Sequence, residues 1–220
     1  MVLAAAGGAW WLYASRDALV KHAIEGLGPQ ITGVSVTVKR VNLEPTEGRG
    51  AIMGLEVGNP AGYRAPRALS LGEMRLALDY STLTSNVIRI KEISLQGPVI
   101  TYEPGAGGDN LTAIQKHIDA QVAKLGGSKS ADSGSGRKFI IDNIYVRDAK
   151  VQFGDALGLP MPNVHLRDVG KRSNGASAGE VVKAVWGSVA GGATNVASRA
   201  GGVVKAGAKN VIEGARSLFK

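Results

Sequence analysis

Alternation of apolar and polar residues between Gly33 and Asp168 constrains the fold of this chain more than any other feature. A period of two over five to nine residues is the pattern of a β-strand with one apolar face. We therefore expect an antiparallel sheet that is covered on one side only or curls around a groove. The alternation occurs in VSVTVKRVNL (34–43), GRGAIMGLEVGN (48–59), EMRLALDYSTL (73–83), NVIRIKEISLQGPVITYE (86–103), RKFIIDNIYVRDAKVQFG (137–154) and MPNVHLRDVG (161–170).

The alternation slips by one residue inside the segment 86–103. Ile88 and Ile90 share one parity, whereas Ile93 and Leu95 share the other. An extra residue in one strand produces such a slip, so the sequence predicts a bulge or bend near Lys91 and Glu92.

A helical pattern interrupts the predicted strands at DNLTAIQKHIDAQVAKL (109–125). Asp109 or Asn110 can cap the helix, and apolar residues then recur at helical spacing. We predict one inserted helix over 110–125. The glycine- and serine-rich stretch that follows predicts a flexible linker over 126–137.

The first fifteen residues, MVLAAAGGAWWLYAS, carry no charge. As a helix they would span ~22 Å, less than the ~30 Å hydrocarbon core of a bilayer. Trp10, Trp11 and Tyr13 cluster as the aromatic belt at a membrane interface does. We predict a membrane anchor helix over 1–28, ended by Gly26 and Gly28-Pro29.

Two alternatives to an anchor are a cleaved signal peptide and a soluble core helix. The segment lacks the basic start and the A-x-A site of a signal peptide, and adjacent tryptophans near the start of a chain disfavour a core helix. Arg16 and Lys21 follow the segment, which by the positive-inside rule would place the bulk of the protein in the cytoplasm.

The tail from Lys171 to Lys220 carries eight Lys or Arg and two Glu, so it holds +6 of the total charge of +8. Apolar residues recur there every three to four positions, which predicts a long amphipathic helix over about 179–220. Seven glycines from Gly187 to Gly214 each cost a helix ~1 kcal/mol relative to Ala. The helix therefore needs a surface on which to fold.

That surface is expected to be an anionic bilayer. The residues predicted to contact membrane are Trp10, Trp11, Tyr13, Val182, Trp186, Val189, Val196, Val204, Val211 and Leu218. Gly187, Gly191 and Gly202 allow close helix packing instead, against a protein partner or another copy of the chain. A partly disordered basic tail is the third alternative.

Chemistry-bearing motifs are sparse. The chain has no cysteine, and His22, His117 and His165 have no partner at metal-ligand spacing. No Gly-x-Ser-x-Gly elbow or phosphate loop is present. We expect no enzymatic activity, no catalytic residue, no metal and no cofactor. Nucleic acid is not an expected partner either, because the tail has few aromatic residues and a regular apolar stripe.

Several segments together are similar to the AsmA-like family of bacterial envelope proteins. These are the apolar N-terminus, VTVKRVNL, GLEVGNPAGY with ALSLGEMRLALDYSTL, IRIKEISLQGPVITYE leading to NLTAI, and FIIDNIYVRDAKVQF. The resemblance covers about residues 1–170, and its motifs are loose and mostly structural. Large members have a much longer sheet than this chain offers. The tail after Gly170 lies outside the resemblance.

The resemblance implies an α+β protein with an N-terminal membrane helix, a curved, mainly antiparallel sheet and a place in the bacterial inner membrane, with its bulk in the periplasm. It implies lipid handling or envelope assembly, with phospholipid as a ligand. A scaffold or accessory subunit of a membrane assembly is the alternative. Groove-lining residues would be Val36, Val38, Met53, Leu55, Val57, Leu76, Leu78, Ile88 and Ile90, although the same residues fit a β-sandwich core.

The expected domains are an anchor helix over 1–28, an AsmA-like β domain over 29–170 and a basic helical tail over 171–220. Within GLEVGNPAGY, Asn59-Pro60 is interpreted as the end of a strand, because proline cannot donate to a ladder. Tyr63 is expected to pack back on the sheet. The motif is thus predicted to be structural.

Overall fold

The computed structural model describes residues 2–127, 137–153 and 157–218. It is an α+β fold whose described part contains three α-helices and a mixed nine-stranded sheet. The helices are α1 (Val2–Thr32), α2 (Asn110–Gly127) and α3 (Ala178–Leu218). The strands of the sheet are β1 (Val36–Glu44), β2 (Arg49–Gly58), β3 (Arg67–Leu78), β4 (Val87–Gln96), β5 (Val99–Thr101), β8 (Lys138–Arg147), β9 (Lys150–Phe153), β10 (Leu157–Pro160) and β11 (Val164–Val169).

The sheet is mixed, whereas the sequence predicted a mainly antiparallel one. Strands β1, β2, β3 and β4 pair antiparallel in chain order. After β4 and β5 the chain passes through a short hairpin, β6 (Pro104–Gly105) and β7 (Gly108–Asp109), and then through α2. It returns so that β8 pairs parallel with β4, and β9 parallel with β5. The inserted helix is therefore the crossover that a parallel pair requires.

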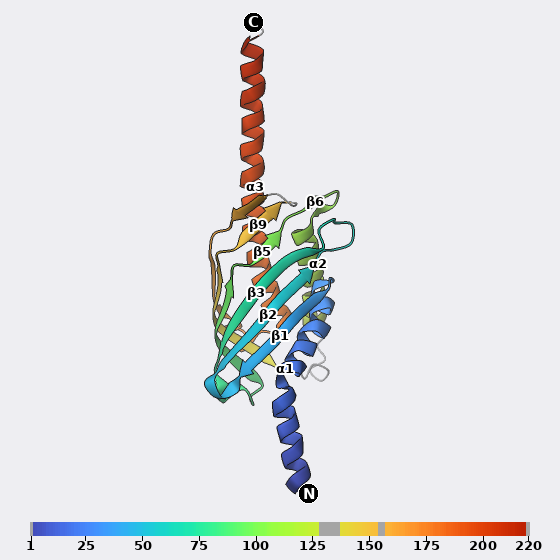
Figure 1. The fold of residues 1–220 in the computed structure, drawn as a ribbon, viewed down its shortest axis with the longest axis vertical. Helices are drawn as coiled ribbons and strands as arrows, with labels where there is room; N and C mark the ends of the chain where they lie inside the picture. Colours follow the sequence, from blue (N-terminus) through green and yellow to red (C-terminus); the bar gives the residue numbers. More distant parts are fainter. Residues whose placement is uncertain (1, 128–136, 154–156, 219–220) are drawn as a thin grey trace.

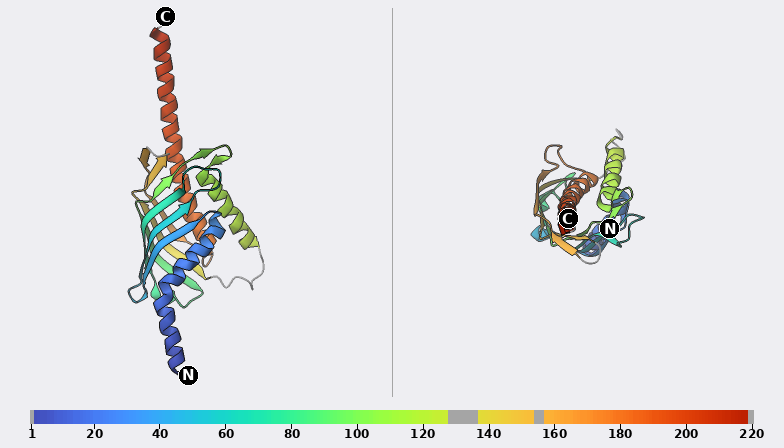
Figure 2. Two further views of the ribbon diagram at one scale, coloured as in Figure 1. Left: turned by 45° about the vertical axis from the view of Figure 1, so that its right-hand side comes forward. Right: turned by 90° about the horizontal axis from the view of Figure 1, so that it is seen from above.

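The sheet curves around α3, as the view from above in Figure 2 shows. Figure 1 shows that the start of α1 and the end of α3 project from opposite ends of the molecule. One hydrophobic core joins Ile31 of α1, Leu111 of α2 and Trp186 of α3 to the apolar face of the sheet. The core thus includes residues on both sides of the domain boundary predicted after residue 170.

Two irregularities change which residues point inward. The predicted irregularity at Lys91–Glu92 is confirmed. Ala77 pairs with Glu92 and the next residue, Leu78, pairs with Ile90, so Lys91 has no opposite residue on β3. A second one lies at Gly54, whose φ of 63° is left-handed. Lys39 faces it, and an added Cβ on Gly54 would lie 2.7 Å from the Lys39 Cβ. Glycine is required there by both its conformation and its neighbour.

Helix α1 continues through Gly26, Gly28 and Pro29 to Thr32, so the predicted stop was wrong. Pro29 has no N–H to donate to the carbonyl of Glu25, so the helix continues past it with one backbone hydrogen bond fewer. The Thr32 hydroxyl donates to the Gly28 carbonyl at 2.8 Å. Gly33, at a φ of 75°, ends the helix and donates its N–H to the Pro29 carbonyl at 2.9 Å.

Candidate functional site

The concave face of the sheet is the candidate site that the sequence predicted as a lipid groove. Among the predicted lining residues, the structure buries Val36, Val38, Val57 and Ile88. Leu55, Leu76 and Ile90 are partly buried and pack against the core, and Leu78 is half-buried. These residues share one apolar face, and helices cover that face.

Met53 belongs to the opposite face of the sheet, so its place in the predicted groove was wrong. It pairs with Arg40 and Glu73, and the Arg40 Nη2 lies 3.1 Å from its Sδ. The irregularity at Gly54 is the cause. On one side of it the odd-numbered Leu55 and Val57 point inward, and on the other side the even-numbered Ile52 does.

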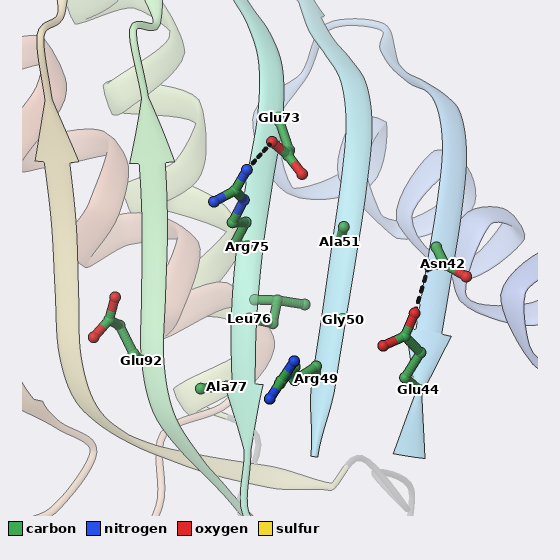
Figure 3. A pocket seen from close by; sticks show the side chains of 10 residues that line it. All are labelled: Asn42, Glu44, Arg49, Gly50, Ala51, Glu73, Arg75, Leu76, Ala77 and Glu92. Atoms are coloured by element: carbon green, nitrogen blue, oxygen red, sulfur yellow. Dashed lines mark hydrogen bonds and ion pairs between the residues drawn. The ribbon is translucent and has the colours of Figure 1, made fainter. Parts of the chain in front are cut away.

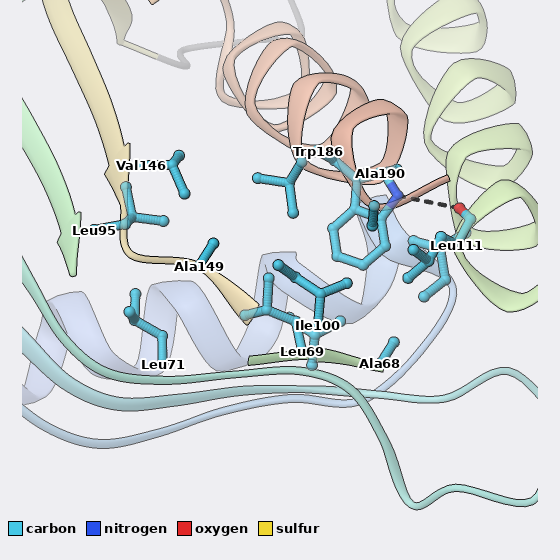
Figure 4. Close-up of a cluster of buried hydrophobic side chains, with 14 of the residues drawn as sticks. Ala68, Leu69, Leu71, Leu95, Ile100, Leu111, Val146, Ala149, Trp186 and Ala190 are labelled. Carbon is cyan, nitrogen blue, oxygen red and sulfur yellow. Dashed lines mark hydrogen bonds between the residues drawn. The ribbon is translucent and has the colours of Figure 1, made fainter. Parts of the chain in front are cut away.

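The first half of α3 fills the concave side. Trp186 is 6% exposed, and Val189 and Ala193 are more deeply buried. Figure 4 shows the indole of Trp186 above Ile100, with Leu111 beside it. The indole Nε1 donates a hydrogen bond of 3.2 Å to the Leu111 carbonyl. The sheet's apolar face is thus occupied by the chain's own helix.

The packing of α3 against the sheet corrects the prediction that Trp186 and Val189 contact a membrane. Trp186 and Val189 are core side chains here, and Val182 and Val196 are partly buried against the same core. The surface on which this part of the tail folds is therefore the sheet. The side chains of Trp10, Trp11, Tyr13, Val204, Val211 and Leu218 lie outside the described residues.

Glycines let α3 approach its neighbours closely. A Cβ on Gly187 would lie 3.4 Å from the Gln115 Oε1, and one on Gly179 would lie 3.2 Å from the Val122 Cγ2. Gly187 was predicted to seat a helical partner, and its partner is α2 of the same chain. A Cβ added to Gly191 would meet no other described element within 4 Å, and Gly202 lies outside the residues whose surroundings are described.

Polar contacts between α2 and α3 are few. Lys183 Nζ lies 2.9 Å from the Asp119 carboxylate, and this hydrogen bond lowers the pKa of Asp119. The buried Oε1 of Gln115 accepts no hydrogen bond from the described residues. The helix is therefore held mainly by apolar packing.

The GNPAGY stretch is held by a polar network at one end of the sheet. Asn110 is fully buried, and its amide donates to the Asn59 Oδ1 and to the Thr101 carbonyl, each at 2.8 Å. The Glu103 carboxylate accepts the backbone N–H groups of Ala65 at 2.9 Å and Arg64 at 2.6 Å. These two bonds are the main reason that the pKa of Glu103 is lowered.

Tyr63 contacts the two-stranded β6–β7 sheet. Its hydroxyl donates to the Gly108 carbonyl at 3.1 Å, and its ring lies against Gly105. It therefore ties the loop after β2 to the β6–β7 hairpin. The sequence interpretation of the stretch as structural agrees with these contacts.

The outer face of the sheet carries an open hollow of about 310 Å³. Figure 3 shows its walls of charged side chains, with Glu73 paired to Arg75 at 3.0 Å and Asn42 bonded to Glu44 at 3.2 Å. Gly50, Ala51 and Ala77 also line it.

Histidines and carboxylates do not converge anywhere in the part of the chain that the structure describes. His117 packs against Gly33, and His165 stacks on Tyr145 with ring centroids 4.2 Å apart. His22 lies exposed on α1. Over the described residues, no three His, Asp or Glu side chains are grouped so that they could hold a metal ion.

Within the described residues, no helix is both long enough and apolar enough to cross a membrane.

No model of a known protein family matches this chain, and no curated protein is similar to it in sequence. The AsmA-like resemblance therefore stays a prediction from the motifs quoted above.

Proposed function

We propose that this chain is a non-enzymatic, membrane-associated scaffold that helps to assemble or maintain a bacterial envelope, at the inner membrane with its body in the periplasm. One observation carries the choice of a scaffold: α3 fills the concave side of the sheet with Trp186, Val189 and Ala193. A lipid carrier needs that face free for acyl chains, whereas a scaffold needs it packed. The AsmA-like motifs support the envelope setting.

Lipid handling is the second candidate. It is favoured by the apolar concave wall and by the composition of the helix that covers it. Apart from Trp186, the buried residues in the described part of α3 are small: Gly179, Val189, Ala190 and Ala193. In a carrier, α3 would leave the wall and phospholipid chains would replace it.

A disulfide that locks α3 onto α2 separates the two functions. The Cγ2 of Val122 lies 3.2 Å from a Cβ placed on Gly179, which suits a Val122→Cys and Gly179→Cys pair. The chain has no other cysteine that could interfere. Cells that lack the native protein express either the double-cysteine protein or one of the two single-cysteine controls, and their growth in detergent is measured. Mass spectrometry then measures the lipid bound to each purified protein.

A scaffold keeps its function when it is locked and holds no more lipid than the single-cysteine controls. Loss of function and of bound lipid in the locked protein alone would overturn the scaffold in favour of the carrier. Normal detergent resistance in cells without the protein would contradict both envelope functions.

A further inference from the structure

Helix α1 turns its charged residues toward the protein. Its 31 residues contain four ionic side chains, those of Arg16, Asp17, Lys21 and Glu25. All four reach backbone groups of β1, an edge strand that pairs only with β2 among the described strands. The charges therefore lie on the side of α1 that faces the sheet, beside Val20, Ile24 and Ile31, which pack against the core.

At each of two residues of β1, a carboxylate of α1 accepts the backbone N–H and a cationic side chain of α1 donates to the carbonyl. Glu25 accepts the Val38 N–H at 2.9 Å, and Lys21 donates to the Val38 carbonyl. Near the other end of β1, Asp17 accepts the Leu43 N–H at 3.0 Å. Arg16 donates to the Leu43 carbonyl through Nε at 3.1 Å and through Nη2 at 2.9 Å. Side chains thus satisfy edge groups that a further strand would otherwise occupy.

The outward side of α1 has no ionic residue as a consequence. Leu19 is 48% exposed and Leu27 is 49% exposed. Ala18, Ala23 and Gly26 are exposed beside them, together with the polar residues His22 and Gln30. Residues 2–15, which continue the same helix, contain no ionic side chain at all. An uncharged surface therefore runs along the full length of α1, ~46 Å at 1.5 Å per residue.

We propose that this outward face of α1 lies on the surface of a lipid bilayer, with Leu19 and Leu27 inserted and the sheet held behind the helix. The inference rests on the membrane association in the proposed function and adds which residues make the contact. Contact must be one-sided, because β1 occupies the opposite side of α1 from Glu25 to Arg16. A helix attached in this way meets lipid as an interfacial helix does.

Continuity with the uncharged segment 2–15 favours lipid over a second copy of the chain. A protein interface ordinarily has a polar and charged rim around its apolar centre. The outward face between residues 16 and 32 offers only His22 and Gln30 as polar side chains. This composition suits a hydrocarbon boundary.

The absence of cysteine in the sequence allows a direct test on the full chain. Ala23→Cys places an environment-sensitive fluorophore in the middle of the outward face, and Ser85→Cys places it on an exposed turn elsewhere. Each protein is mixed with phosphatidylcholine vesicles and with vesicles that also hold phosphatidylglycerol, at about 0.1 M and about 1 M salt. Spin-labelled lipid then reports whether the probe reaches the acyl region.

We expect the probe at position 23, and not at 85, to shift to the blue and to be quenched with both vesicles at both salt concentrations. Replacing Leu19 and Leu27 by Gln should weaken binding about thirtyfold, because two half-exposed leucines no longer insert. The matched control is Tyr80→Gln, which changes an exposed apolar residue away from α1 and should leave binding unchanged.

Binding to anionic vesicles alone that disappears in high salt would overturn the proposal, because cationic residues would then make the contact. Self-association without vesicles that is lost in the Leu19→Gln, Leu27→Gln protein would overturn it in favour of a second copy. No quenching at position 23 under any condition would overturn it as well. These outcomes are independent of the α3 lock, which tests the scaffold and the carrier.

Discussion

The indole of Trp186 donates its hydrogen bond to the carbonyl of Leu111, 75 positions earlier in the chain. This bond connects the crossover helix α2 to the helix that covers the sheet. It also satisfies the one polar atom of a side chain that is otherwise buried among apolar residues. Trp186 is the largest buried side chain in the described part of α3.

Replacing Trp186 by Ala should lower the free energy of unfolding by about 3–5 kcal/mol, because a large side chain is lost from a packed core. Trp186→Phe keeps most of the apolar area and removes the hydrogen bond, so a smaller loss of about 1–3 kcal/mol is expected. Urea unfolding of the full chain measures both values. A loss below about 0.5 kcal/mol for Trp186→Ala would contradict the seat of α3 described above.

Replacing Asn110 by Ala should loosen the loop that contains Asn59 and Pro60. The buried amide is lost, and the Asn59 Oδ1, the Thr101 carbonyl and the Glu103 N–H are left without it. We expect a loss of about 1–3 kcal/mol in stability. Hydrogen exchange should accelerate at Arg64 and Ala65. Thr112→Ser, which keeps the hydroxyl that bonds to Asp109, is the control and should leave this exchange unchanged.

Stability should fall in acid through Glu103. Hydrogen bonds from Ala65 and Arg64 lower the pKa of this carboxyl in the folded chain. Its contribution is therefore present above the ordinary pKa and is lost as the pH falls through the lowered one. The urea concentrations at the unfolding midpoints of the native protein and of Glu103→Gln should differ at about pH 7 and converge at about pH 2. A constant difference across that range would exclude ionisation of Glu103 as the cause.

Replacing Gly54 by Ala should destabilise the sheet, because the new Cβ would meet the Lys39 Cβ in a left-handed conformation. We expect a loss of about 2 kcal/mol or more, which corresponds to a melting point about 4–8 °C lower. Gly72 in β3 is the matched control, since an added Cβ there meets nothing within 4 Å. Gly72→Ala should change the melting point by less than about 2 °C.

Local patterns predicted the individual elements well. The alternation around Val36 and Val38, the helix beginning at Asn110 and the slip at Lys91 all reflect short-range constraints of strand and helix geometry. Such constraints are encoded within a few residues, so one sequence is sufficient to find them.

Long-range partners were not predictable in the same way. The stripe containing Trp186 and Val189 fits a bilayer and a protein core equally well, because both are apolar. The parallel pairing of β4 with β8 depends on where the chain returns after α2. Gly54 was the available signal for the reversal that moves Met53 outward, since a glycine inside a strand often marks a bulge.

The position of α3 in the chain has a consequence for biosynthesis. Every strand of the sheet leaves the ribosome before Trp186, Val189 and Ala193, which cover its concave side. During that interval a broad apolar surface is open to other nascent chains and to chaperones. A pause in translation shortly before Ala178 would prolong this vulnerable interval more than a pause at any earlier strand.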